Sequence, residues 1–318
     1  MDYKKIFQMF ILGTGELSKA LGLGLGGTIL FSKDIQDENA TKELIKQIKM
    51  EALIPPFISI DQEGGRVERT ENIYPRRLSP KFAYEKGVEF LSLQASEIAT
   101  ELNSLGFNLN FAPCADVNTN PDNPIIGERA FSNNIPEVIE GVQIVSNIHK
   151  GCGIIPCVKH FPGHGDANND SHLTLPKINL TLQEMENIHI KPFKHAIQDD
   201  IDMVMIAHLH CECFDKERIP TSLSHNAISY LRNDLGFNGV IISDDMKMKG
   251  IELELKDALI KGVEAGLDMF IYRESDDMVM NAIENLIFRA EKDINFRNKI
   301  ESSYAKIISL KEKYGFIK

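Results

Sequence analysis

Short, continuously apolar stretches recur along the chain, separated by longer stretches in which apolar residues repeat every three or four positions. The apolar stretches predict strands at 8–12, 28–31, 57–61, 108–113, 154–160, 203–208, 240–244 and 269–272. The periodic stretches predict helices at 41–52, 90–105, 135–150, 182–199, 227–234 and 253–265. Strands that are apolar on both faces and alternate with helices indicate parallel βα units rather than an all-β fold.

This pattern favours an α/β protein that forms a single-domain (β/α)8 TIM barrel over residues 1–318, with a doubly wound open sheet as the alternative. No low-complexity linker or charge block divides the chain. A basic amphipathic segment near the end predicts a C-terminal helix, at about 280–314, that docks on the barrel.

Charge and composition exclude several classes of protein. A net charge of −11 disfavours a nucleic-acid binder, which needs a basic face to neutralise phosphates. No apolar stretch approaches the ~20 residues of a membrane span, and the first residues lack the pattern of a signal peptide. The 5 cysteines lie mostly in apolar stretches and are typical of reduced thiols. We therefore expect a cytoplasmic monomer with no membrane or nucleic-acid partner.

Polar residues gather where the predicted strands end. Strand ends of a barrel meet at one face, which carries the active site in enzymes of this fold. The sequence therefore predicts one pocket formed by the residues that follow successive strands: Asp61–Arg66, Asp116, Lys159–His160, His208 and Ser243–Asp245.

Two pairs of residues are candidates for acid–base or nucleophilic chemistry. Asp170 and His172 lie two positions apart in a long polar loop, so a carboxylate there could fix the tautomer of an imidazole that handles a proton. This motif alone is also common as a surface pair. Asp244 and Asp245 end a buried strand, and alternation lets only one of them point into the barrel mouth. The pattern alone does not choose between them.

No metal or cofactor is expected. The glycine-rich segment 22–27 fits a dinucleotide-binding motif, but a strand follows it where that motif requires a helix. The histidines and cysteines of 208–213 lack the spacing of a zinc site. A metal-dependent barrel hydrolase that uses the histidines remains a rival interpretation.

Several segments together resemble glycoside hydrolase family 3, specifically its bacterial β-N-acetylglucosaminidase (β-N-acetylhexosaminidase) branch of peptidoglycan recycling. The segments occur in the family's order and extend over most of the chain: 61–69 (DQEGGRVER), 126–131 (IGERAF), 159–166 (KHFPGHGD), 170–172 (DSH), 220–224 (PTSLS) and 243–246 (SDDM).

The resemblance implies a barrel without a second domain and a set of residue roles. Asp244 would be the nucleophile of a retaining exo-acting enzyme, and His172, paired with Asp170, would be the general acid and base. Residues that bind the terminal N-acetylglucosamine would be Asp61, Arg69, Arg129, Lys159 and His160. The implied substrate is an N-acetylglucosaminyl-anhydromuropeptide from the cell wall.

Two other functions stay open. A β-N-acetylglucosaminide phosphorylase of the same branch would use phosphate where the hydrolase uses water. A catalytically silent sugar-binding protein would keep the binding residues and could dispense with Asp244. Glu63 and Glu128 are further acids near the motifs, and we expect them to pair with the arginines. Because the chain has no tryptophan, sugar recognition must depend mainly on hydrogen bonds.

Overall fold

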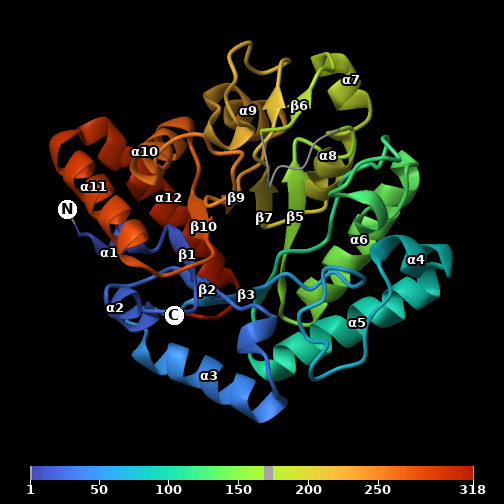
Figure 1. Ribbon diagram of the computed structural model, residues 1–318, viewed down its shortest axis with the longest axis horizontal. Helices are drawn as coiled ribbons and strands as arrows, with labels where there is room; N and C mark the ends of the chain where they lie inside the picture. Colours follow the sequence, from blue (N-terminus) through green and yellow to red (C-terminus); the bar gives the residue numbers. More distant parts are fainter. Residues whose placement is uncertain (1, 168–174, 318) are drawn as a thin grey trace.

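The computed structural model describes residues 2–167 and 175–317. Its centre is a closed barrel of parallel strands in the order β1-β10-β9-β7-β5-β4-β3-β2 (Figure 1). The first strand pairs with the last, with Phe10 opposite Phe270, so the predicted TIM barrel is confirmed and the open sheet is excluded. The barrel strands are β1 (Phe10–Gly13), β2 (Gly27–Ile29), β3 (Phe57–Ile60), β4 (Leu109–Asn110), β5 (Ile155–Phe161), β7 (Met203–Ile206), β9 (Val240–Asp245) and β10 (Met269–Tyr272).

Helices surround the barrel and bury one face each against it (Figure 1). In α5 the buried residues include Leu91, Ala95, Ile98 and Leu102, the spacing of one apolar helix face. The helices are α1 (Lys4–Phe7), α2 (Leu17–Gly22), α3 (Glu38–Glu51), α4 (Pro80–Glu85), α5 (Val88–Leu105), α6 (Ile135–Gly151), α7 (Leu182–Asn187), α8 (Lys191–Gln198), α9 (His225–Ser229), α10 (Leu255–Ala265), α11 (Asp277–Lys292) and α12 (Ile294–Lys313).

Three predicted helices are interrupted. The helix expected at 182–199 is divided into α7 and α8, because Pro192 in the first turn of α8 has no N–H for a continuous helix. The helix expected at 227–234 changes after α9 into a π-helical turn, Tyr230–Asp234. The segment expected to be one C-terminal helix forms α11 and α12. Asp293 between them is extended, and its carboxylate caps the start of α12.

The last helix is bonded to the N-terminal end of the barrel. Lys311 of α12 is fully buried, and its Nζ atom donates to Oε1 of Gln8 at 2.7 Å and to the main-chain oxygen of Gly26 at 3.0 Å. The same amine lies 4.8 Å from the centre of the Phe57 ring. Burial lowers the pKa of Lys311 to about 7.

Two further strands lie outside the barrel. β6 (Lys177–Ile178) and β8 (His210–Cys211) pair in parallel as a small separate sheet. The strand expected at 108–113 is reduced to Leu109–Asn110 in β4, since Pro113 cannot donate to a ladder. Across the described ranges, every helix is too short or too polar to span a membrane.

Candidate active site

The C-terminal strand ends surround a cavity of about 220 Å³. Ligand pockets for drug-sized molecules are usually about 300–1,000 Å³, so this cavity suits one sugar unit rather than a polysaccharide chain. The structure brings most of the predicted site residues together in its wall: Asp61, Arg69, Arg129, Lys159, His160 and Asp244. Asp170 and His172 lie outside the described residues.

Lys159 on β5 is the buried cation at the centre of the site. Its side chain is only 2% exposed, and its Nζ atom lies 2.7 Å from Oδ1 of Asp61 and 2.6 Å from Oε1 of Glu63. Burial by itself lowers the pKa of Lys159, but the two carboxylates outweigh burial and raise it. Lys159 is therefore held charged as a fixed hydrogen-bond donor.

Glu63 also forms a bidentate ion pair with Arg129. The Nε and Nη2 atoms of Arg129 lie 2.9 and 2.8 Å from the two oxygens of Glu63. Burial raises the pKa of Glu63, but Arg129 and Lys159 outweigh it and hold the pKa well below its usual range. The prediction that Glu63 partners an arginine is confirmed. Glu128 forms no ion pair within 2–167 or 175–317.

His160 continues this network to Asp116. Nη2 of Arg129 lies 3.2 Å from Nε2 of His160, and Nδ1 of His160 lies 2.7 Å from Oδ2 of Asp116. Arginine can only donate, so Nε2 accepts and Nδ1 carries the proton that His160 donates to Asp116. The charge network thus fixes both the tautomer and the orientation of His160.

Asp244 and Asp245 at the end of β9 have different surroundings, although both line the cavity. Asp245 accepts hydrogen bonds from the main-chain N–H groups of Lys247 and Arg273, at 3.1 and 3.3 Å. It also pairs with the Arg273 side chain, whose Nε atom is 3.1 Å away. Within the described part of the chain, Asp244 accepts a hydrogen bond only from the N–H of Asp245, at 2.7 Å. Asp244 is thus the acid left available to a ligand.

The electrostatic surroundings keep Asp244 ionised. Burial raises the pKa of Asp244, but the N–H of Asp245 and the positive charge of Lys159 outweigh burial and lower the pKa below its ordinary value. A carboxylate that is ionised, and faces a cavity with one hydrogen bond from the protein, can act as a nucleophile.

The turn after β3 positions Asp61 and Glu63. Gly64 and Gly65 have φ values of 97° and 61°, where L side chains are strained. An added Cβ at Gly64 would overlap the main-chain oxygen of Leu78. Gln62 accepts the N–H of Arg69 at 2.8 Å and so folds the motif back on itself.

Arg69 contributes a cation to the cavity wall, and no carboxylate within residues 2–167 and 175–317 pairs with it. Its side chain makes no ion pair in the parts of the chain that are described, and its Nε atom is buried without a hydrogen bond. A guanidinium held in this way is ready to bind an oxygen of a ligand.

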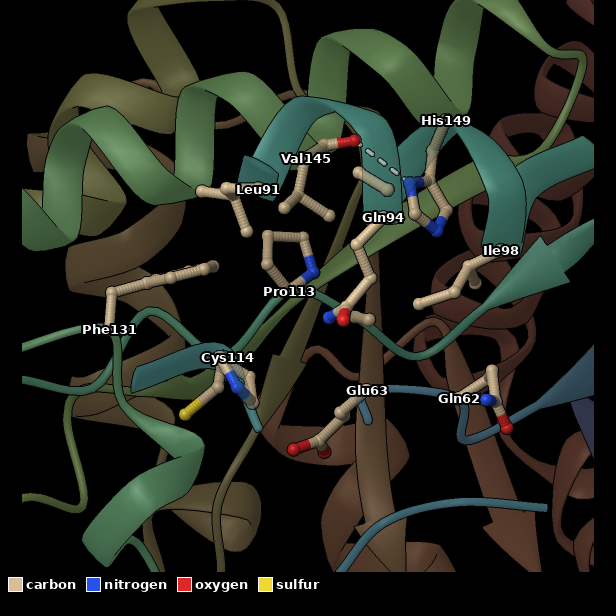
Figure 2. Close-up of a pocket in the computed structure, with 13 residues that line it drawn as sticks. Gln62, Glu63, Leu91, Gln94, Ile98, Pro113, Cys114, Phe131, Val145 and His149 are labelled. Atoms are coloured by element: carbon tan, nitrogen blue, oxygen red, sulfur yellow. Dashed lines mark hydrogen bonds between the residues drawn. The ribbon is translucent and has the colours of Figure 1, made fainter. Parts of the chain in front are cut away.

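A second, smaller cavity of about 30 Å³ lies behind Glu63. Figure 2 shows Gln62, Glu63 and Cys114 along one side and Leu91, Val145 and His149 along the other. Most of its wall is apolar, which contributes to the desolvation of Glu63 and so strengthens its dependence on Lys159 and Arg129.

Cys114, Asp116 and His160 each bring a possible metal ligand atom within 4.8 Å of the others. These atoms already bond to one another, with Sγ of Cys114 at 3.1 Å from Oδ2 of Asp116. Burial raises the pKa of Cys114 well above its usual value, and a protonated thiol is a poor metal ligand. We therefore interpret the trio as a hydrogen-bond network. The expectation of no metal stays a prediction.

Two residues of the site went unassigned in the sequence analysis. Asp116 was recognised as a strand end, but its bond to His160 joins positions 44 residues apart, and no local pattern predicts that contact. Arg273 directly follows β10, and this position at a strand end was the signal that could have identified it.

Comparison with known proteins assigns the family. The sequence pattern of the glycosyl hydrolase family 3 N-terminal domain matches residues 14–310. Beta-hexosaminidase A of Pseudoalteromonas piscicida is 34% identical over 282 residues, which is 80% of this chain. The chain belongs to glycoside hydrolase family 3.

Two further proteins are similar over nearly the same extent. A beta-hexosaminidase of Neisseria meningitidis serogroup C is 33% identical over 283 residues, covering 85% of this chain and 77% of that protein. The solved structure of a family 3 beta-N-acetylglucosaminidase from Paenibacillus sp. str. FPU-7 is 29% identical, with a TM-score of 0.94, over 99% of this chain and 62% of that one. The chain spans 47% of the Pseudoalteromonas protein and 62% of the Paenibacillus protein, so both are considerably longer than this chain.

Proposed function

We propose that this family 3 barrel is a retaining exo-β-N-acetylglucosaminidase that removes a terminal β-linked N-acetylglucosamine. The observation that carries the proposal is the ionised Asp244 carboxylate, which faces a cavity of one-sugar size across from the buried donors Lys159 and Arg129. The relatives named as hexosaminidases support the choice of sugar.

The reaction proceeds in two displacements. In the first, an oxygen of Asp244 bonds to the anomeric carbon, the glycosidic C–O bond breaks, and the leaving oxygen takes a proton from a general acid. In the second, water gives a proton to the same group, now a base, and attacks the anomeric carbon. The bond to Asp244 breaks, the carboxylate is restored, and the sugar leaves with its original anomeric configuration.

We assign the general acid and base to His172, oriented by Asp170. Both residues lie outside the described part of the chain, so this assignment depends on the sequence motif and the resemblance. A histidine suits the role because its ordinary pKa of ~6.5 lets it give and take a proton near neutral pH.

The remaining site residues would hold the sugar. Lys159 and Arg129 are charged donors fixed by Glu63, and charge-assisted hydrogen bonds to hydroxyl or acetamido oxygens are about twice as strong as neutral ones. Asp61 accepts from sugar hydroxyls, and Arg69 supplies a further guanidinium. His160 is held by Asp116 in one tautomer, which fixes the hydrogen-bonding character it presents.

We further propose that the natural substrates are N-acetylglucosaminyl-anhydromuropeptides and that the enzyme acts on them in the cytoplasm as a monomer. This part of the proposal rests on the resemblance of the motifs to enzymes of peptidoglycan recycling. A phosphorylase of the same family is the alternative, since a neutral histidine would not repel an incoming phosphate.

The deciding experiment is release of 4-nitrophenol from its β-N-acetylglucosaminide with chelator present, with and without phosphate. The wild type is compared with Asp244→Ala and with Asp245→Asn, which tests the neighbouring acid. We expect phosphate-independent release that disappears in Asp244→Ala and persists, at a reduced rate, in Asp245→Asn. NMR should detect the β-anomer as the first product. Formation of sugar 1-phosphate would instead identify a phosphorylase, and a fully active Asp244→Ala would reject the nucleophile assignment.

A further inference from the structure

Arg273 is a cation at the cavity that the catalytic scheme leaves without a role. It follows β10, the strand beside the β9 that ends at Asp244 and Asp245, and it lines the same cavity as these acids. Its side chain is 47% exposed, against 11% for Arg129 and 2% for Lys159. Arg273 therefore belongs to the open side of the site, where a ligand would extend toward solvent.

The guanidinium of Arg273 is held through its Nε atom. Its Nε atom lies 3.1 Å from Oδ2 of Asp245. Within the described residues, neither Nη1 nor Nη2 of Arg273 takes part in a hydrogen bond, whereas Arg129 directs both Nε and Nη2 at Glu63. The bond to Asp245 fixes the direction of the side chain. The two terminal amino groups then remain as a pair of parallel donors. Such a pair matches the two oxygens of a carboxylate.

The position of Arg273 separates it from the sugar-binding cluster. The barrel order places β10 across the barrel from β4, and the proposed sugar-binding residues Asp61 and Lys159 follow β3 or lie on β5, the two neighbours of β4. Displacement at the anomeric carbon needs the leaving oxygen on the face opposite Asp244. The group beyond the scissile bond would therefore extend away from the strand end that carries Asp244, toward the open side of the cavity, where the side chain of Arg273 is 47% exposed.

Neighbouring cations do not compete for this role. Lys247, on the loop after β9, is already paired with Glu274. Arg69 follows β3, on the side of the cavity that holds Asp61. Among the described residues that line the cavity, Arg273 is thus the cation on the β9–β10 side whose terminal amino groups are not hydrogen-bonded.

We propose that Arg273 forms the leaving-group site and selects substrates whose leaving group carries a carboxylate, such as an acidic sugar or a peptide attached to one. The inference rests on the proposed function, because it presumes that a sugar is cleaved at Asp244. Arg273 is a specificity-determining residue in this scheme and takes no part in bond breaking.

The test compares two disaccharides that differ only in charge: N-acetylglucosamine β-1,4-linked to N-acetylmuramic acid, and the same compound with its carboxylate converted to the methyl amide. The measured quantity is the ratio of kcat/KM for the acid to kcat/KM for the amide. The ratio is determined for the wild type, Arg273→Met and Arg273→Lys. Arg289→Met is the control, because Arg289 on α11 is similarly exposed and pairs with two acids, Glu264 on α10 and Asp293 before α12.

We expect the wild type to favour the acid about tenfold, a preference that corresponds to one charge-assisted hydrogen-bonded pair near the surface. The ratio should fall to about one in Arg273→Met and stay at the wild-type value in Arg289→Met. Arg273→Lys should give a ratio between those two values. Because a ratio is measured, a general loss of activity from unpairing Asp245 cancels. Sodium chloride should also reduce the wild-type ratio, since it screens exposed charges.

Two outcomes separate the failure of this inference from failure of the proposed function. If the wild type cleaves the acid and the amide equally well, or if Arg273→Met keeps the preference, Arg273 does not select the leaving group, and the hydrolase stands. If the wild type cleaves neither disaccharide nor the 4-nitrophenyl glycoside, the proposed function itself is rejected. Activity of Arg273→Met and Arg273→Lys on the amide shows that each variant is folded.

Discussion

The Nε2 atom of His208 lies 3.1 Å from the main-chain oxygen of Asp245, the residue after the proposed nucleophile. A carbonyl oxygen can only accept, so Nε2 donates, and Nδ1 accepts from the hydroxyl of Ser222 at 2.7 Å. His208 is 1% exposed and lies two residues after β7, the sixth strand of the barrel in chain order. It therefore links the ends of β7 and β9 at the residue that follows Asp244.

Replacing His208 should slow the reaction without preventing sugar binding. We expect His208→Ala to lower kcat about 10- to 100-fold with little change in KM, because displacing a nucleophile by about 1 Å costs rates of that order. Ser222→Ala should have a smaller effect in the same direction. His225→Ala, at an exposed position, is the control. A rise in KM at constant kcat would show that His208 acts on binding instead.

Neutralising Glu63 should destabilise the wall of the sugar pocket. Glu63→Gln keeps the shape but leaves Lys159 and Arg129 buried with too little negative charge. Removing one partner of a buried ion pair costs about 3–5 kcal/mol of unfolding free energy. Urea denaturation measures the loss, and Glu97→Gln, which removes a more exposed partner of Arg77, should cost about 1 kcal/mol or less. Equal midpoints for both variants would contradict the structural role given to Glu63.

Gly165 should not tolerate a methyl group. An added Cβ would overlap the main-chain oxygen of Val117, whereas at Gly151, at the end of α6, nothing lies within 4 Å. Overpacking of this kind costs about 1–3 kcal/mol, so Gly165→Ala should lower the melting temperature. Gly151→Ala should leave it unchanged or raise it slightly, since alanine is favoured over glycine in a helix. The pair of variants separates close packing from a general effect of replacing glycine.

The buried amine of Lys311 should make stability depend on pH above neutrality. Its pKa is about 7 in the folded protein, against an ordinary lysine pKa of 10.5, so the unfolded chain binds more protons between these pH values. The stability contributed by this group therefore rises with pH from about 7 to 10.5 and is constant below 7. Lys311→Met removes this dependence.

Denaturation in urea at pH 7.5 and pH 9 tests this prediction. Each pKa unit corresponds to about 1.4 kcal/mol, so wild type should gain up to about 2 kcal/mol relative to Lys311→Met between these pH values. Lys46→Met, at an exposed site on α3, should show the pH dependence of the wild type. Parallel pH profiles for wild type and Lys311→Met would mean that Lys311 stays charged in the fold.

The sequence predicted best those features that depend on local pattern. The strand expected at 269–272 has the same bounds as β10, because each of its residues is buried and the pattern is unbroken. The convergence of Asp61, Lys159 and Asp244 also followed from the sequence, since parallel strands in a closed barrel end at one face.

The pattern of apolar and polar residues could not predict contacts between residues that are far apart in the chain. Arg129 lies in a 3₁₀ turn rather than at a strand end, so only the family resemblance identified it, and its bond to Glu63 spans 66 positions. Gln8 fell inside a predicted strand, yet it lies before β1 and its side chain donates to the main-chain oxygens of Gly24 and Leu25. A single polar residue in an apolar run does not reveal whether its partner is a loop or a neighbouring strand.

Pairing of β1 with β10 has a consequence for how the chain folds during synthesis. One edge of β1 pairs with β2, but its other edge stays unpaired until Tyr272 at the end of β10 has left the ribosome. About 260 residues are made in that interval, which takes roughly 13–50 s at translation rates of about 5–20 residues per second. Until then the growing sheet has two open edges, and an unpaired edge is a template for joining another chain. Closure of the ring therefore removes both open edges in one step, and with them this route to association between chains.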